Sequence, residues 1–65
     1  RTVSFQLNDV PKIRDGTYSK EGLATAEKLD LYLHCAGLTD ADGQKVAKII
    51  EETPKDLKVL YLNLE

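Results

Sequence analysis

The stretch "LDLYLHCAGLTDADG", from Leu29 to Gly43, joins a predicted strand to a predicted helix. Leu29, Leu31 and Leu33 alternate with other residues, which is the period of a strand with one buried face. Thr39 and the two aspartates that follow it offer side-chain caps and negative charge for the first turn of a helix. The stretch therefore predicts a strand-to-helix connection, which is typical of an α/β fold.

Two further segments show the same alternation. Near the N-terminus, Val3, Phe5 and Leu7 alternate with polar residues, which predicts a strand over residues 2–7. The C-terminal "LKVLYLNLE", residues 57–65, predicts a third strand with leucines along one face.

Helical patterns lie between these strands. Thr17 or Ser19 is expected to cap a helix that ends near Lys28. The "NDVPKIRDG" before it contains a proline and an Asp-Gly pair, so it is expected to form loop and turn. A second, more amphipathic helix is expected to end before Pro54. Its apolar stripe consists of Val46, Ala47, Ile49 and Ile50.

The predicted order is strand, helix, strand, helix, strand. Strands joined by helical crossovers pair in parallel with right-handed connections, so the fold class is α/β. We expect a three-stranded parallel βαβαβ unit with its helices on one face, and with the first and last strands at the sheet edges. One core should join the leucine face of the sheet to the helices, and its members are Leu33, Leu38, Ile49, Ile50, Leu60 and Leu62.

Length and composition indicate a single small folded domain over residues 1–65. Hydrophobic residues make up 42% and charged residues 31%, too apolar for a disordered chain. A chain of this size buries only about 60% of its unfolded surface, so its core is marginal. The formal net charge is -2 with charges of both signs scattered along the chain, which predicts neither a nucleic-acid partner nor a membrane partner. The single cysteine, Cys35, allows no internal disulfide and favours a reducing, intracellular compartment.

The segment "LYLHCAGLTDADGQKVAKIIEETPKDLKVLYL" resembles the ribonuclease-inhibitor type of leucine-rich repeat. Its matching positions are Leu31, Leu33, Leu38, Leu57, Leu60 and Leu62. Lys28 departs from the pattern at a leucine position, and Ala36 stands where the turn residue is commonly Asn or Cys. A βαβαβ unit without repeats is the alternative. The resemblance implies protein recognition through the strand face, and it implies that the chain can be a fragment of a longer repeat protein.

No set of residues predicts catalysis, so we do not expect an enzyme. Cys35 and His34 are adjacent on a strand and should point to opposite faces, so a buried cysteine is expected in place of a nucleophile with its base. One Cys and one His are too few for a metal site. "DADG" does not fit a calcium loop, because Leu38 and Ile49 would occupy carboxylate positions. Neither a metal nor an organic cofactor is predicted.

The strand face turned away from the helices is the candidate binding surface. The segment "FQL" and the two "LYL" segments, set over one another, predict that Gln6, Tyr32 and Tyr61 align across the sheet, with His34 and Asn63 aligned after them. Tyrosine is enriched at binding hot spots because it combines apolar area with a polar tip. The partner-binding residues are therefore Gln6, Tyr32, His34, Tyr61 and Asn63, and the alternative is a face that is merely solvated.

These observations predict a non-enzymatic protein-protein interaction module that uses its open sheet face or its edge strands. The partner is another protein or a second copy of the chain. The alternative function is a structural subunit or fragment that is stable only when it is assembled with another chain.

Overall fold

The computed structural model describes residues 1–34 and 36–64. Three strands alternate with helical segments, as the sequence predicts. The elements are β1 (Thr2–Phe5), the 3₁₀ helix η1 (Leu7–Asp9), α1 (Val10–Asp15), α2 (Lys20–Ala24), β2 (Lys28–Tyr32), α3 (Asp40–Glu51) and β3 (Val59–Asn63).

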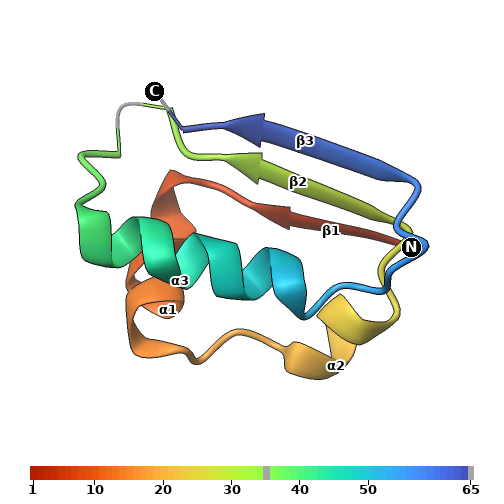
Figure 1. Cartoon of the computed structure of the whole chain (residues 1–65). Coiled ribbons are helices and arrows are strands. Elements are labelled where there is room, and N and C mark those ends of the chain that lie inside the picture. Colours follow the sequence, from red (N-terminus) through yellow and green to blue (C-terminus); the bar gives the residue numbers. More distant parts are fainter. Residues whose placement is uncertain (35, 65) are drawn as a thin grey trace.

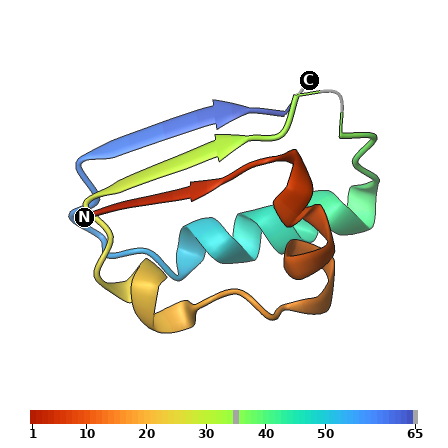
Figure 2. The same ribbon diagram turned by 180° about the vertical axis from the view of Figure 1, so that it is seen from behind.

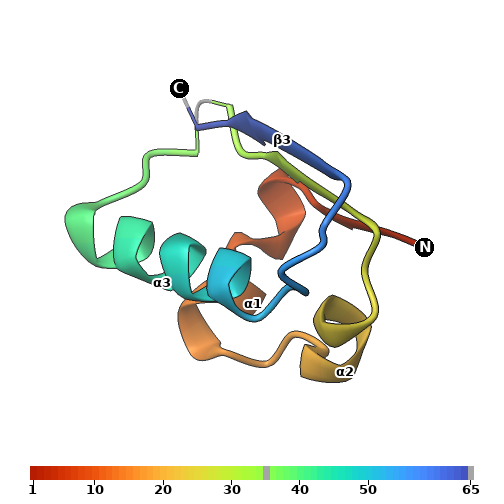
Figure 3. The same cartoon turned by 45° about the vertical axis from the view of Figure 1, so that its right-hand side comes forward.

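The strands form one parallel sheet in the order β1-β2-β3. Figures 1 and 2 show α1, α2 and α3 on the same side of this sheet, so its other face is open. Figure 3 shows the two layers from a third direction, with the sheet above the helices. The predicted α/β class and the parallel βαβαβ arrangement are confirmed, and β1 and β3 are the edge strands.

Helix α1 lies where the sequence predicted loop and turn, so that prediction is wrong. Pro11 occupies the first turn, where its missing N–H has no intrahelical partner to lose. Gly16 ends the helix in the left-handed conformation at φ 71°, and its N–H donates to the Lys12 carbonyl. Val10 and Ile13 are spaced as neighbours on one helix face and are both buried. Proline and glycine therefore mark the ends of a short helix here.

Side-chain caps begin the two later helices. Ser19 Oγ accepts the Gly22 N–H at 3.1 Å, which selects Ser19 over Thr17 as the cap of α2. Helix α2 is much shorter than predicted and ends at Ala24. At α3, Thr39 Oγ1 accepts the Asp42 N–H at 3.3 Å, and Asp42 Oδ2 accepts the Thr39 N–H at 3.0 Å. This reciprocal pair is a capping box, which satisfies two backbone donors at once.

The core lies between the helices and the first two strands. Leu33 and Ile49 are fully buried, while Leu38 and Ile50 pack against the core from its margin. The remaining buried members are Phe5, Val10, Ile13, Leu23, Leu29, Leu31 and Val46.

Leu60 and Leu62 were predicted to belong to the core, and this is wrong because they are 45% and 41% exposed. They pair with Leu29 and Leu31 of β2 and therefore share the helix-side face of the sheet. Their position on the edge strand leaves no further strand or helix to complete their cover among the described residues.

The register between β2 and β3 also differs from the prediction by two residues. Tyr61 lies beside Asp30, and Asn63 lies beside Tyr32. The two tyrosines are thus diagonal neighbours on the open face. A shift of two residues preserves which side chains share a face, so the predicted facing of both strands is correct.

Candidate functional site

The open face of the sheet combines two tyrosines with polar residues. Tyr32 on β2 and Tyr61 on β3 are 44% and 47% exposed. Asp30 lies between Ser4 of β1 and Tyr61 of β3 in the strand register. Diagonal positions in a sheet are within reach of aromatic side chains, so Tyr32 and Tyr61 can contact one partner group together. The centre of this face is a carboxylate with aromatic neighbours.

His34 extends the same face beyond the end of β2. Its ring lies 6.5 Å from that of Tyr32, measured between centroids, with the two planes tilted by 32°. Asn63 is half-buried, and its carbonyl accepts the Leu33 N–H at 2.8 Å. The structure therefore places Tyr32, His34, Tyr61 and Asn63 in one region of the sheet.

Gln6 directly follows the end of strand β1 and is not part of the strand. Strand β1 ends at Phe5, and the backbone N–H of Gln6 donates to Asp9 Oδ2 at 2.9 Å as the chain enters η1. Gln6 is therefore not paired with Tyr32 in the strand register. Sequence alternation continued the strand to Leu7, but the turn into η1 ends it earlier.

Asp30 is the residue of this face that the sequence prediction missed. Its Oδ1 atom is buried and has no hydrogen-bond partner among the described residues. Buried carboxylate oxygens are normally hydrogen-bonded, because withdrawing them from water is costly. An aspartate inside a predicted strand, two residues before a tyrosine, was the sequence signal that could have marked it.

The free edge of β3 is the second candidate surface. Val59, Leu60, Tyr61 and Leu62 are all exposed, so this strand shows apolar side chains on both faces. The Val59 N–H donates inward to the Glu27 carbonyl. Since backbone groups alternate along a strand, the N–H groups of Leu60 and Leu62 point outward to the free edge. These groups are available to pair with another strand.

A hollow of about 260 Å³ adjoins the opposite edge, between β1 and the first two helices. Its lining is mixed in charge, and Lys12 Nζ lies 3.9 Å from Asp9 Oδ1. The lining residues are Arg1, Val3, Ser4, Phe5, Asp9, Lys12, Thr17, Tyr18, Ser19 and Gly22.

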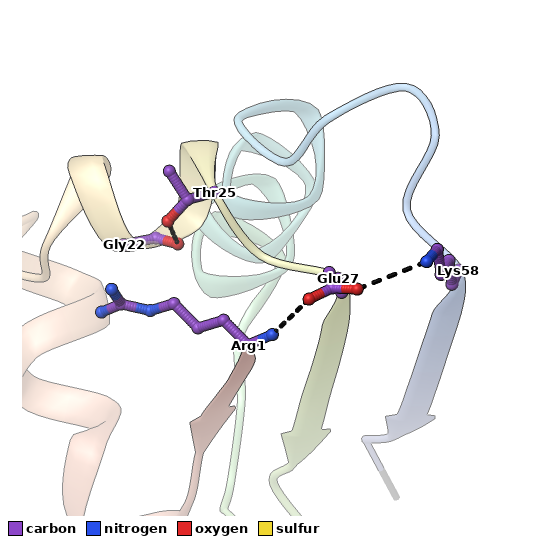
Figure 4. Close-up of polar contacts among 5 residues, drawn as sticks. All are labelled: Arg1, Gly22, Thr25, Glu27 and Lys58. Carbon is purple, nitrogen blue, oxygen red and sulfur yellow. Dashed lines mark hydrogen bonds and ion pairs between the residues drawn. The ribbon is translucent and has the colours of Figure 1, made fainter.

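Glu27 joins the N-terminal ends of all three strands (Figure 4). Its Oε1 accepts the terminal ammonium of Arg1 at 2.7 Å, and its Oε2 accepts Lys58 Nζ at 3.3 Å. These donors lower the pKa of Glu27 below its ordinary value. The Thr25 hydroxyl nearby donates to the Gly22 carbonyl at 3.2 Å at the end of α2. Because Glu27 is exposed, these ion pairs add little to the stability of the fold, and their main effect is to align the strand ends.

Tyr18 and Glu52 form a further titratable pair on the helix side. Burial raises the pKa of Tyr18, and the negative charge of Glu52 acts in the same direction. The Tyr18 ring packs edge-on against Phe5 with centroids 5.8 Å apart. This packing ties the connection between α1 and α2 to the core, which is a structural role.

Cys35, which was predicted to be buried, lies outside the described residues. Across residues 1–34 and 36–64, no group of three or more metal-ligating side chains is placed to hold a metal ion. None of the helices in that part of the chain has the length and hydrophobicity needed to span a membrane.

Comparison with known proteins identifies no relative: no protein-family model, curated protein or solved structure matches the chain. The resemblance to leucine-rich repeats therefore stays a prediction that rests on the spacing of the leucines.

Proposed function

We propose that the chain is a non-enzymatic protein-interaction module whose β3 edge accepts a strand from another polypeptide, a second copy of the chain being the first partner to test. The observation that carries this proposal is the exposure of β3 on both faces. Leu60 and Leu62 lie on the helix side, Val59 and Tyr61 lie on the open side, and all four are exposed.

An added strand would satisfy the outward backbone groups of Leu60 and Leu62 and cover their side chains. Exposed, apolar edge strands are usually blunted by charge, proline or a covering element, because they pair readily with other chains. No charged residue lies within Val59–Asn63. Strand addition at such an edge combines backbone hydrogen bonds with pockets for alternate side chains.

The resemblance to leucine-rich repeats supports the same function. In that family, strand-helix units stack so that each covers the apolar face of the next, and stability comes from the contacts between neighbours. Strand β2 is covered in this way, since Leu29 and Leu31 are fully buried. The corresponding leucines of β3 lack that cover.

Sedimentation and hydrogen exchange at increasing protein concentration test the proposal. We expect the outward amides of Leu60 and Leu62 to exchange fast in dilute solution and to gain protection as copies associate. The inward amides of Tyr61 and Asn63 serve as internal controls, because they should be protected throughout. Fast exchange of the outward amides at every concentration, in a chain that sediments as a monomer, would contradict pairing between copies.

Two matched variants locate the contact. Leu62→Lys introduces a charge at the β3 edge and should abolish association, whereas Leu7→Lys alters a leucine of similar exposure on η1 and should not. Equal association of both variants would show that another surface is used.

The alternative function, a structural subunit stable only in an assembly, makes a different prediction. Circular dichroism of that subunit should lose its helical signal on dilution, because folding and association would be coupled. A module should keep that signal in its dilute monomer. The buried core formed by β1, β2 and the helices favours the module.

A further inference from the structure

Asp30 occupies the middle of the open sheet face. The register places Ser4 and Tyr61 on either side of it, with Lys28 and Tyr32 two residues away along its own strand. Its Oδ1 atom is buried without a hydrogen-bond partner among the described residues. None of the ion pairs formed by those residues includes Asp30. The one carboxylate among the strand residues of this face is therefore uncompensated within the described chain.

A cationic donor from outside the chain would compensate this carboxylate, and contact with Oδ1 requires the side chains that cover it to move aside. A carboxylate oxygen that is shielded from water gains more from a charged hydrogen-bond donor than a fully hydrated oxygen does. The reason is that less water screens the attraction between the two charges. The net charge of the chain is -2, which also favours approach of a basic partner.

The aromatic neighbours specify the type of cation. Tyr61 lies directly beside Asp30, and Tyr32 lies on the same face of β2, with both side chains exposed. Tyrosine rings attract cations at their faces. A guanidinium group is planar, stacks on such rings and donates two parallel hydrogen bonds to a carboxylate, whereas an ammonium is a compact and strongly hydrated charge.

We infer that the open sheet face binds an arginine side chain of a partner protein, with the guanidinium paired to Asp30 and packed against Tyr32 and Tyr61. This inference goes beyond the proposed function, because it uses the open face and does not depend on strand addition at the β3 edge. Lys28 lies two residues before Asp30 on the same face, so its positive charge opposes binding.

A titration followed by nuclear magnetic resonance tests the inference on the intact chain. The probe is N-acetyl-arginine methylamide, and the matched control is the corresponding citrulline derivative, which has a similar shape without the charge. The arginine probe should cause saturable shifts in the amide signals of Asp30, Leu31 and Tyr32 and in the ring signals of Tyr61. Equal shifts with the citrulline probe, or unchanged spectra with both probes, would overturn the inference.

Variants assign the contact to the carboxylate. Asp30→Asn keeps the side-chain shape, and we expect it to weaken arginine binding about two- to fivefold by removing the ion pair. Asp15→Asn removes one negative charge from an exposed position in α1, on the helix side, and should leave binding unchanged. Lys28→Gln should strengthen binding. Equal affinities of the Asp30→Asn variant and the wild-type chain would refute the site.

Two further measurements separate loss of this site from loss of the fold and from loss of association at the β3 edge. Asp30→Asn should melt at or above the wild-type temperature, because a neutral amide costs less to shield from water than a carboxylate. Its weaker binding would therefore not reflect unfolding. Leu62→Lys, which should abolish association at the β3 edge, should leave the arginine titration intact, so the two proposals can fail separately.

Discussion

The guanidinium of Arg14 on α1 donates to both carboxylate oxygens of Asp42 on α3. Nε lies 3.0 Å from Oδ1, and Nη2 lies 2.8 Å from Oδ2. Asp42 is buried and also accepts the Thr39 N–H. One carboxylate therefore joins α1 to α3 and satisfies a backbone N–H at the start of α3. Paired, two-point contacts of this kind fix orientation as well as distance. The short helix α1 is thereby held against the longest helix of the chain.

This contact predicts a loss of stability in acid. The Arg14 guanidinium, followed by the backbone N–H of Thr39, holds the pKa of Asp42 well below its ordinary value. A carboxyl group with a lowered folded-state pKa adds stability above its unfolded pKa, about 4, and loses that contribution as the pH falls further. The unfolding free energy should therefore decrease below about pH 4. Urea denaturation between pH 2 and pH 7 measures this decrease.

Substitution of Asp42 should make the unfolding free energy depend less steeply on pH in acid. Asp42→Asn removes the titrating group and should give a lower urea midpoint at pH 7 with a shallower decrease in acid. Arg14→Gln keeps the cap at Thr39 and should flatten the curve only in part. If both variants retained the wild-type steepness in acid, other carboxyl groups would be responsible for it.

Two glycines should respond to alanine in opposite directions. Gly16 has a φ of 71°, so Gly16→Ala forces a left-handed alanine and should cost about 1 kcal/mol although the added methyl group meets no atom. Gly43 lies inside α3 with open space around it, so Gly43→Ala should stabilise by up to about 1 kcal/mol. Urea midpoints with unchanged slopes would measure both effects. A stabilising Gly16→Ala would show that α1 does not end at this glycine.

Most of the architecture could be predicted because alternation in strands and the amphipathic pattern of α3 are local properties. Thr39 was correctly included among the caps for the same reason, since its partner Asp42 lies three residues away. The sequence pattern does not reveal helix α1, because a proline within a segment usually predicts a break in structure, although proline is well suited to a first helical turn.

The register and the exposed leucines depend on the tertiary structure. Leucines at every second position of β2 and β3 fit one another equally well after a shift of two residues, so alternation alone does not fix the pairing. Burial of Leu62 would require a neighbour beyond β3, which is not a property of the strand itself. The shielding of Asp30 Oδ1 likewise depends on its neighbours in space.

Leucine substitutions should measure how unevenly the sheet is covered. Leu33 is fully buried, so Leu33→Ala should cost about 2 to 5 kcal/mol through lost burial and the cavity that remains. Leu62 is 41% exposed, and Leu62→Ala should cost about 1 kcal/mol or less in the dilute monomer. Thermal and urea unfolding, followed by circular dichroism, would compare the losses of stability in the two variants.

A small domain has little stability to lose, so Leu33→Ala is expected to be largely unfolded at room temperature. Leu33→Val removes less volume and provides a variant that should remain measurable, with a cost between those of the two alanine variants. Equal losses for Leu33→Ala and Leu62→Ala in dilute solution would mean that β3 is already covered there. A loss at Leu62 that appears only at high protein concentration would instead measure the contribution of the β3 edge to association.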